Sequence, residues 1–145
     1  MRRVAEVGCG TGAMGMAIAM AMPEVEVLLI DRRQKAVGFC EIIVWRLELP
    51  NVKVIQADLE QDSSPVGRVD AALFRAVSPV PEDLEMAEEI VRRGGLALIW
   101  TRFDQPLVEK DGWIAEERQF TKVAGLVLHI YRRAEKGADA ADRRE

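Results

Sequence analysis

The chain has 145 residues, of which 49% are hydrophobic and 30% charged, so it is long enough for one domain with its own core. Its formal net charge of −4 argues against indiscriminate binding to nucleic acid, although a local basic patch is compatible with that charge. No apolar run is long enough to span a bilayer, there is no signal-peptide pattern, and neither cysteine has a partner at metal-ligand spacing. We therefore expect a cytoplasmic protein without a disulfide framework, a metal site or a membrane partner.

The chain begins with a buried strand over Val4–Val7, a glycine-rich turn over Gly8–Gly12 and an apolar helix over Ala13–Met22. Glycines let the backbone turn sharply and let a ligand approach it closely. The helix that follows directs free N–H groups and the positive end of its dipole toward such a ligand. This arrangement predicts a site for a nucleotide-type cofactor.

Two cofactor fingerprints overlap in the turn. Gly8-x-Gly10-x-Gly12 is the pattern of S-adenosylmethionine (SAM) methyltransferases, whereas the dinucleotide fingerprint fits from Gly8 only in its looser form, with Ala13 last. Glu6 favours SAM, because an acid at this place can hold the amino or carboxylate end of SAM and would repel a pyrophosphate. A dinucleotide and a tight turn without a ligand are the alternatives.

The second strand, Val25–Ile30, ends at Asp31, about 20 residues past the glycines. An acid at this place accepts hydrogen bonds from a ribose diol, and an N-cap role for the next helix is the competing interpretation. That helix is predicted over Gln34–Glu48. One of its faces points toward a sheet and consists of Ala36, Cys40, Ile43, Val44 and Leu47. Phe39, Ile42 and Trp45 form a second apolar stripe.

The third strand, Val52–Gln56, leads to Asp58 and Leu59. In a SAM site an acid at this place lies beside the adenine and accepts a hydrogen bond from its exocyclic amine. A solvated loop carboxylate is the alternative for Asp58. Residues 61–68 are predicted to be a loop because they are rich in serine, proline and glycine.

The fourth strand, Val69–Phe74, places Arg75 at its carboxyl end, where ligands bind in open α/β sheets. The next helix is predicted from Pro81 to Arg93, and Gly94–Gly95 are expected to stop it. The fifth strand, Leu96–Trp100, then brings Arg102 to the same edge of the sheet.

Residues 104–112 are too few for a full crossover helix, and two strands, Trp113–Thr121 and Leu126–Arg132, should form an antiparallel hairpin. His129, the only histidine, is expected to be structural. The predicted fold is α/β, a mainly parallel seven-stranded sheet with an antiparallel C-terminal hairpin, as in class I SAM-dependent methyltransferases. We expect one domain over residues 1–134 and a disordered tail over 135–145.

Several stretches together resemble the bacterial small-subunit ribosomal RNA guanine-N7 methyltransferases, also called glucose-inhibited division protein B. These stretches are Val7–Gly15, Leu29–Asp31 with Lys35 and Phe39, Asn51–Ile55 and, most specifically, Phe74-Arg75-Ala76-Val77-Ser78-Pro79-Val80-Pro81 leading to Gly94–Gly95. The resemblance covers roughly residues 3 to 100. Met14 stands where the family usually has proline, and the family carries a helical segment ahead of the first strand.

The resemblance implies binding of SAM and of ribosomal RNA. The cofactor residues expected are Glu6, Gly8, Cys9, Gly10, Gly12, Asp31, Asp58, Leu59 and Arg75. Arg75 and Arg102 are expected on the substrate side, where an arginine meets phosphate or a guanine edge through two hydrogen bonds. Arg32, Arg33 and Lys35 either extend this patch or are solvated surface. No residue is assigned as catalytic, because N7 of guanine has a free lone pair and needs no general base.

The function predicted is SAM-dependent methylation of guanine N7 in small-subunit ribosomal RNA. A SAM-binding module or subunit without catalysis is the first alternative, and a methyltransferase acting on a small molecule or another RNA is the second. The first helix is apolar on every side, which predicts an exposed apolar patch. We expect self-association or a partner there, with Met16 and Met20 in the contact.

Overall fold

A computed structural model describes residues 1–75, 78–102, 106–122 and 125–135. It contains one seven-stranded sheet in the order β3-β2-β1-β4-β5-β7-β6. The strands are β1 (Arg3–Val7), β2 (Glu26–Asp31), β3 (Val52–Gln56), β4 (Val69–Arg75), β5 (Val91–Arg102), β6 (Trp113–Phe120) and β7 (Leu126–Arg133). The helices are α1 (Ala13–Ala21), α2 (Gln34–Arg46) and α3 (Val80–Ile90).

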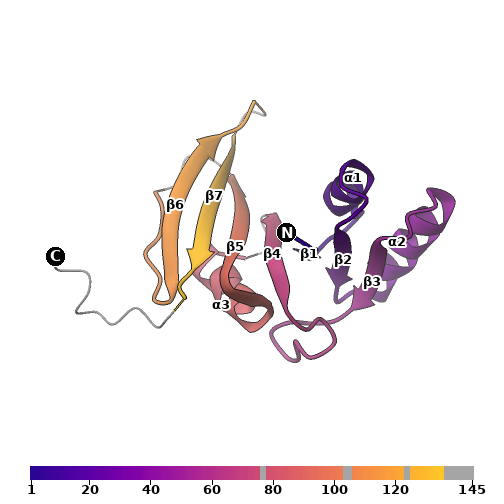
Figure 1. Cartoon of the computed structure of the whole chain (residues 1–145), viewed down its shortest axis with the longest axis horizontal. Helices are drawn as coiled ribbons and strands as arrows, with labels where there is room; N and C mark the ends of the chain where they lie inside the picture. The colour runs from indigo at the N-terminus through magenta and orange to yellow at the C-terminus, as the bar shows by residue number, and fades with distance from the viewer. Residues whose placement is uncertain (76–77, 103–105, 123–124, 136–145) are drawn as a thin grey trace.

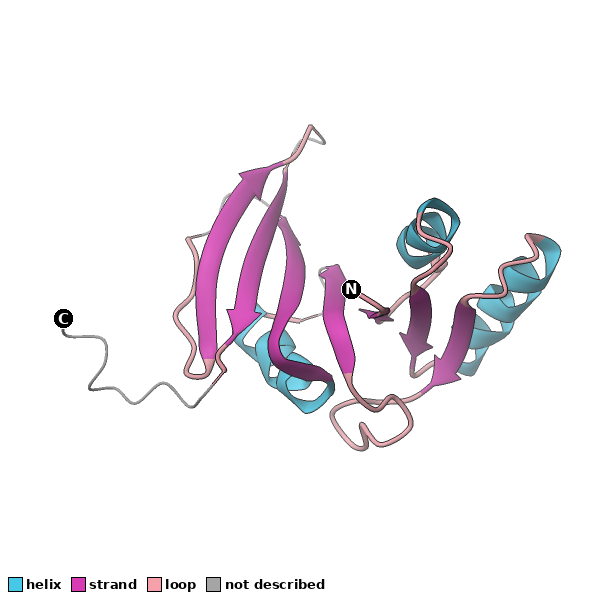
Figure 2. Ribbon diagram, in the orientation of Figure 1, coloured by secondary structure: helices cyan, strands magenta, loops and turns pink. Residues whose placement is uncertain are grey.

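The first five strands run parallel, while β7 is antiparallel to both β5 and β6 (Figure 1). This confirms the predicted fold class and the terminal hairpin. The central strands are rich in aliphatic residues because both of their faces are covered. Helices α1 and α2 pack on one face, over β1, β2 and β3, and α3 packs on the other face against β4 and β5 (Figure 2).

The junction between α3 and β5 differs from the prediction. The helix ends at Ile90 rather than at Arg93, and Val91 already pairs with Val69 of β4. Gly94, with φ of 74°, and Gly95 therefore lie inside the strand, where they accompany a shift in register, and do not stop the helix. A Cβ at Gly95 would lie 2.7 Å from the carbonyl oxygen of Asp70, which explains why glycine is needed there.

Helix α2 ends at Arg46, two residues before the predicted end, because Glu48 adopts a left-handed conformation with φ of 52°. Cys40 faces the sheet and is fully buried, as the periodicity predicts. Leu47, which was expected on the same face, lies past the helix and is exposed.

Helix α1 is exposed on part of its surface, as expected for a helix without a polar residue. Met20 is 54% exposed, and Ile18 is half-buried. Met16 was also expected in an external contact, but this expectation is wrong: Met16 is buried in the core beneath α1. Beside this helix, Leu98 and Trp100 of β5 are only half-buried.

Four segments lie outside the described residues. They are 76–77 in the motif after β4, 103–105 after β5, 123–124 in the hairpin turn and 136–145 in the expected tail. In the described part of the chain, no helix is long and apolar enough to cross a membrane.

Candidate functional site

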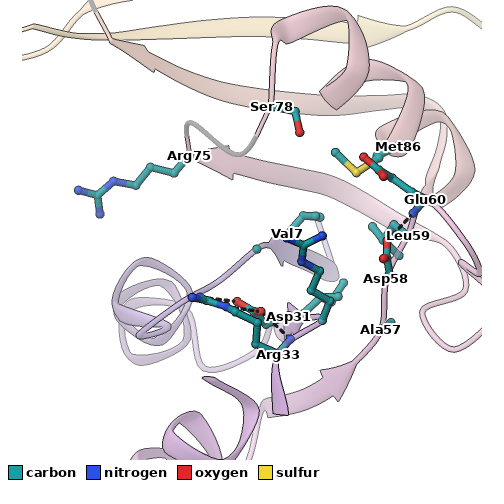
Figure 3. A pocket seen from close by; sticks show the side chains of 13 residues that line it. Val7, Asp31, Arg33, Ala57, Asp58, Leu59, Glu60, Arg75, Ser78 and Met86 are labelled. Atoms are coloured by element: carbon teal, nitrogen blue, oxygen red, sulfur yellow. Dashed lines mark hydrogen bonds and ion pairs between the residues drawn. The ribbon is translucent and has the colours of Figure 1, made fainter. Parts of the chain in front are cut away.

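A cavity of about 330 Å³ opens at the carboxyl ends of β1, β2 and β4, where the parallel strands of an α/β sheet place their ligands (Figure 3). It is lined by residues from both halves of the parallel sheet. These are Val7, Gly8, Ile30, Asp31, Arg32, Arg33, Ala57, Asp58, Leu59, Glu60, Arg75, Ser78 and Met86. Four of the predicted cofactor residues with side chains therefore meet at one cavity.

The glycine turn has the backbone that its sequence requires. Gly8, Gly10 and Gly12 all have positive φ, at 65°, 56° and 72°, a conformation that residues with a Cβ rarely adopt. A Cβ at Gly10 would meet nothing within 4 Å, so the turn is open on that side. At Gly12 a Cβ would lie 2.9 Å from the Leu29 side chain, which keeps α1 close to the sheet.

Glu6 points toward the start of α1 and is buried. One of its carboxylate oxygens accepts a hydrogen bond of 2.6 Å from the backbone N–H of Gly15. This N–H belongs to the first turn of α1, where no partner within the helix is available. Burial raises the pKa of Glu6, although the N–H of Gly15 and the positive charge of Arg75 act in the opposite direction. Glu6 does not line the cavity.

Asp31 is buried at the end of β2 and lines the cavity. Its carboxylate accepts hydrogen bonds from the backbone N–H of Gly10 at 3.0 Å and of Arg33 at 3.0 Å, and it forms an ion pair with the Arg33 guanidinium. Burial disfavours the charged form, but these donors outweigh it and hold the pKa of Asp31 below its usual value. The competing N-cap interpretation is wrong, because Arg33 is the N-cap residue of α2.

Asp58 and Leu59 follow β3 and form the opposite wall. Leu59 is buried, and Asp58 accepts a hydrogen bond of 3.1 Å from the backbone N–H of Glu60. Met86 of α3 lines the same part of the cavity. This wall joins an apolar surface to a carboxylate.

Arg75 is exposed at the end of β4 and lines the mouth of the cavity. Figure 3 shows its guanidinium pointing away from Asp31 and Asp58. Arg102 ends β5, two residues beyond Trp100, the register partner of Arg75, and is exposed at the same edge of the sheet. Arg102 does not line the cavity.

Cys9 lies in the glycine turn, but its side chain packs in the core beneath α1. Its Sγ lies 3.9 Å from the Sγ of Cys40, which donates to the carbonyl oxygen of Gly10 at 3.3 Å. Burial raises the pKa of both thiols. The two cysteines therefore pack the turn against α2 as neutral thiols.

The cavity also contains residues that no sequence motif assigns to it. Ser78 and Met86 come from the region of α3, which has no cofactor motif of its own. The sequence indicates Arg33 only as solvated surface or as an extension of a basic patch, yet its guanidinium forms an ion pair with Asp31. The signal for Arg33 was its position two residues after the predicted ribose acid.

A family model described as rRNA small subunit methyltransferase G matches residues 1–130. The chain belongs to this family. Ribosomal RNA small subunit methyltransferase G of Desulfitobacterium hafniense is 33% identical over 100 residues, which are 67% of this chain and 42% of that protein. The protein of the same name from Nostoc punctiforme is 32% identical over 130 residues, 81% of this chain and 53% of that protein. The chain thus spans about half the length of these relatives.

Solved structures show the same fold at low sequence identity. StiE O-MT matches 98% of this chain and 70% of its own with a TM-score of 0.75 and 14% identity. Coclaurine N-methyltransferase bound to N-methylheliamine and SAH matches 68% of this chain and 30% of its own, with a TM-score of 0.62 and 21% identity. The sheet is therefore that of class I SAM-dependent methyltransferases.

Proposed function

We propose that this chain is the SAM-binding, methyl-transferring part of a small-subunit ribosomal RNA guanine-N7 methyltransferase. The observation that carries the proposal is the position of Asp31: a buried carboxylate of lowered pKa lines the cavity beside Gly8 of the three-glycine turn. Membership of the family supports the type of reaction, and the cavity supports the cofactor.

The residues around the cavity fit SAM. Asp31 keeps oxygens at the cavity that can accept hydrogen bonds from a ribose diol, since its lowered pKa leaves it ionised at neutral pH. Asp58, with Leu59 and Met86 beside it, offers an acceptor and an apolar wall to an adenine. Glu6 and the backbone of Gly8, Cys9, Gly10 and Gly12 are proposed for the methionine end. SAM, when bound, supplies an electrophilic methyl group.

The substrate side is proposed at Arg75 and Arg102, on the carboxyl edge of β4 and β5. Their guanidinium groups can hold phosphate or the edge of a guanine by paired hydrogen bonds. Positioning supplies much of the acceleration in such a transfer, and N7 attack needs no proton acceptor. The proposal therefore assigns orienting roles and no general base.

Two other functions remain as alternatives. Because the chain spans about half of its relatives, it can be a SAM-binding module or subunit whose catalysis needs further polypeptide. A methyltransferase with a small molecule or another RNA as substrate would use the same cavity. Both alternatives keep the same cofactor site as the main proposal and differ from it in whether, and to what, the methyl group is transferred.

Calorimetry of the chain with SAM, S-adenosylhomocysteine (SAH) and NADH tests the cofactor. We expect binding of SAM and SAH, and preferential binding of NADH would contradict the proposal. Transfer of labelled methyl groups to small ribosomal subunits, free ribosomal RNA and unrelated RNA tests the acceptor. Binding of SAM without transfer to any of them would favour the module without catalysis.

We also propose that the exposed strip of α1 contacts a second copy or another polypeptide in the cytoplasm. The supporting observations are the 54% exposure of Met20 and the half-buried Leu98 and Trp100 on the neighbouring sheet face. Light scattering and binding of a dye specific for apolar surface test this idea. A stable monomer at high concentration that binds no dye would contradict it.

A further inference from the structure

The outer face of α2 carries large apolar side chains that point away from the sheet. Phe39 is 48% exposed, Ile42 56% and Trp45 78%. None of them lines the cavity, so the cofactor site does not account for them. Neighbouring exposed side chains of this size on one helix are typical of a contact surface.

Gly38 lies in the middle of the same face. Its φ is not positive, and a Cβ there would meet nothing within 4 Å, so the chain's own packing does not require glycine. Glycine inside a helix lowers helix stability relative to alanine. A close approach of another element over this position would explain its presence.

The spacing of residues along this face of α2 lets the same face of a second copy pack against it. Gly38, Ile42 and Trp45 stand at positions i, i+4 and i+7, so they line one side of the helix. Because Gly38 has no side chain, it leaves a notch in this face. The notch and the indole of Trp45 are two turns apart, about 10 Å along the helix axis. When two copies of α2 pack antiparallel about a two-fold axis near Ile42, each Trp45 meets the Gly38 notch of the other copy.

Two charged residues of α2 and its C-terminal end fit the same antiparallel alignment of the two helices. Lys35 lies near the N-terminus of α2 and Glu48 just past its C-terminus, and both are exposed. Thirteen positions separate them, about 20 Å along a helix, and neither forms an ion pair within the described chain. In the antiparallel pair Lys35 lies beside Glu48 of the second copy. It also lies near the negative end of the other helix dipole, which favours a cation.

From this pattern we propose that the chain forms a two-fold symmetric dimer through the outer face of α2. Such a dimer is isologous: the same notch, indole and charges are used twice. The cofactor cavity stays free in both copies, since none of Lys35, Gly38, Ile42, Trp45 and Glu48 lines it. One helix per copy is a small interface, so we expect a dimer in the micromolar range.

Sedimentation velocity of the chain over a range of concentrations tests the interface. Trp45→Ala should weaken dimerisation at least about tenfold, because a central tryptophan carries much of the energy of an interface. Gly38→Leu should also weaken it, since the notch is filled. The same Gly38→Leu change should raise the melting temperature of the dilute monomer. A substitution that merely damaged the fold would lower both the dimer affinity and the melting temperature, instead of lowering one and raising the other.

Reversing the charges of Lys35 and Glu48 tests the antiparallel alignment of the two α2 helices. Lys35→Glu and Glu48→Lys should each weaken the dimer, more so at low salt, and the double variant should restore it. Rescue requires contact between copies, because the two residues cannot meet within one chain.

Ile114→Gln on β6 serves as the matched control, since Ile114 is as exposed as Ile42 but lies on another element. It should leave the dimer unchanged. A chain that stays monomeric at all concentrations, a dimer indifferent to Trp45→Ala and Gly38→Leu, or a dimer dissociated by Ile114→Gln would each overturn the proposal.

Discussion

Asp31 combines two roles that a single carboxylate can serve together. It binds the N–H groups of Gly10 and Arg33, which fixes the turn, and it lines the cavity. Asp31→Ala should weaken SAH binding by about 1–3 kcal/mol, the cost of losing a hydrogen bond to a buried charged group. Calorimetry measures the loss, and Asp62→Ala, an exposed loop carboxylate outside the cavity, is the control. Equal affinities of the Asp31 variant and the parent would remove Asp31 from the site.

Asp83 is a buried carboxyl that neither the sequence motifs nor the proposed reaction uses. It lies on α3 with no exposed surface. Burial and, to a lesser extent, the charge of Glu82 raise its pKa to about 7, while the N–H of Ser78 only partly offsets them. The folded state therefore holds a proton on Asp83 at pH values where the unfolded chain, with the ordinary pKa of 3.8, has released it.

The folded state binds more protons than the unfolded state between about pH 4 and pH 7, so the contribution of Asp83 to stability falls as pH rises through this window. Asp83→Asn removes the ionisable group, and we expect the free energy of unfolding at pH 7 to rise by about 1–3 kcal/mol. Urea unfolding at pH 4, 5.5 and 7 measures the effect. An increase of the same size at pH 4 would show that the titration of Asp83 is not its cause.

At the scale of elements, the two helical glycines have opposite roles. A Cβ at Gly15 of α1 would lie 2.8 Å from a carboxylate oxygen of Glu6 and still closer to the Leu29 side chain, whereas one at Gly38 of α2 would meet nothing. Gly15→Ala should therefore lower the free energy of unfolding by about 1–3 kcal/mol. Gly38→Ala should raise it by about 0.4–1 kcal/mol, measured below the concentration at which the chain dimerises. Equal effects at the two positions would contradict the packing of α1.

The sequence predicts the elements where hydrophobic periodicity and length decide them. Strands β1 to β4 and both helices of the first two crossovers appear within two residues of their predicted ends, whereas β5 begins at Val91, five residues before its predicted start at Leu96. The α3–β5 junction was predicted wrongly because Gly94–Gly95 were interpreted by their local preference for ending a helix. Pairing of Val91 with Val69, a contact between distant parts of the chain, overrides that preference.

In the candidate site, too, local sequence predicts some residues, and contacts between distant parts of the chain determine the others. Gly8, Asp31, Asp58, Leu59 and Arg75 stand at strand ends, and a parallel sheet gathers its strand ends at one edge, so the sequence alone places them together. Met86 reaches the cavity through the packing of α3, which no spacing rule predicts, and Ser78 lies just ahead of that helix. The burial of Met16 likewise depends on how α1 is rotated against the sheet, and an apolar helix gives no periodic signal for that rotation.

At the scale of the whole molecule, the net charge of −4 opposes the approach of RNA. The proposed RNA contacts must then come from a few local cations, Arg75 and Arg102, at the carboxyl edge of the sheet. Each contact between a cation and a phosphate of single-stranded RNA adds about 0.7 to the magnitude of the slope of log K against log salt. A shallow slope is therefore expected for this chain.

The double variant Arg75→Ala/Arg102→Ala should reduce that slope by about 1.4, two such contacts, and should reduce methyl transfer while SAH affinity stays nearly unchanged. Fluorescence titrations of labelled ribosomal RNA at several salt concentrations measure the slope, and calorimetry measures SAH binding. Arg93→Ala is the matched control, because Arg93 lies on the same strand as Arg102 but at its opposite end, away from the cavity. An unchanged slope would place the RNA elsewhere on the molecule. A parallel loss of SAH affinity would instead assign Arg75 to the cofactor site or to the fold.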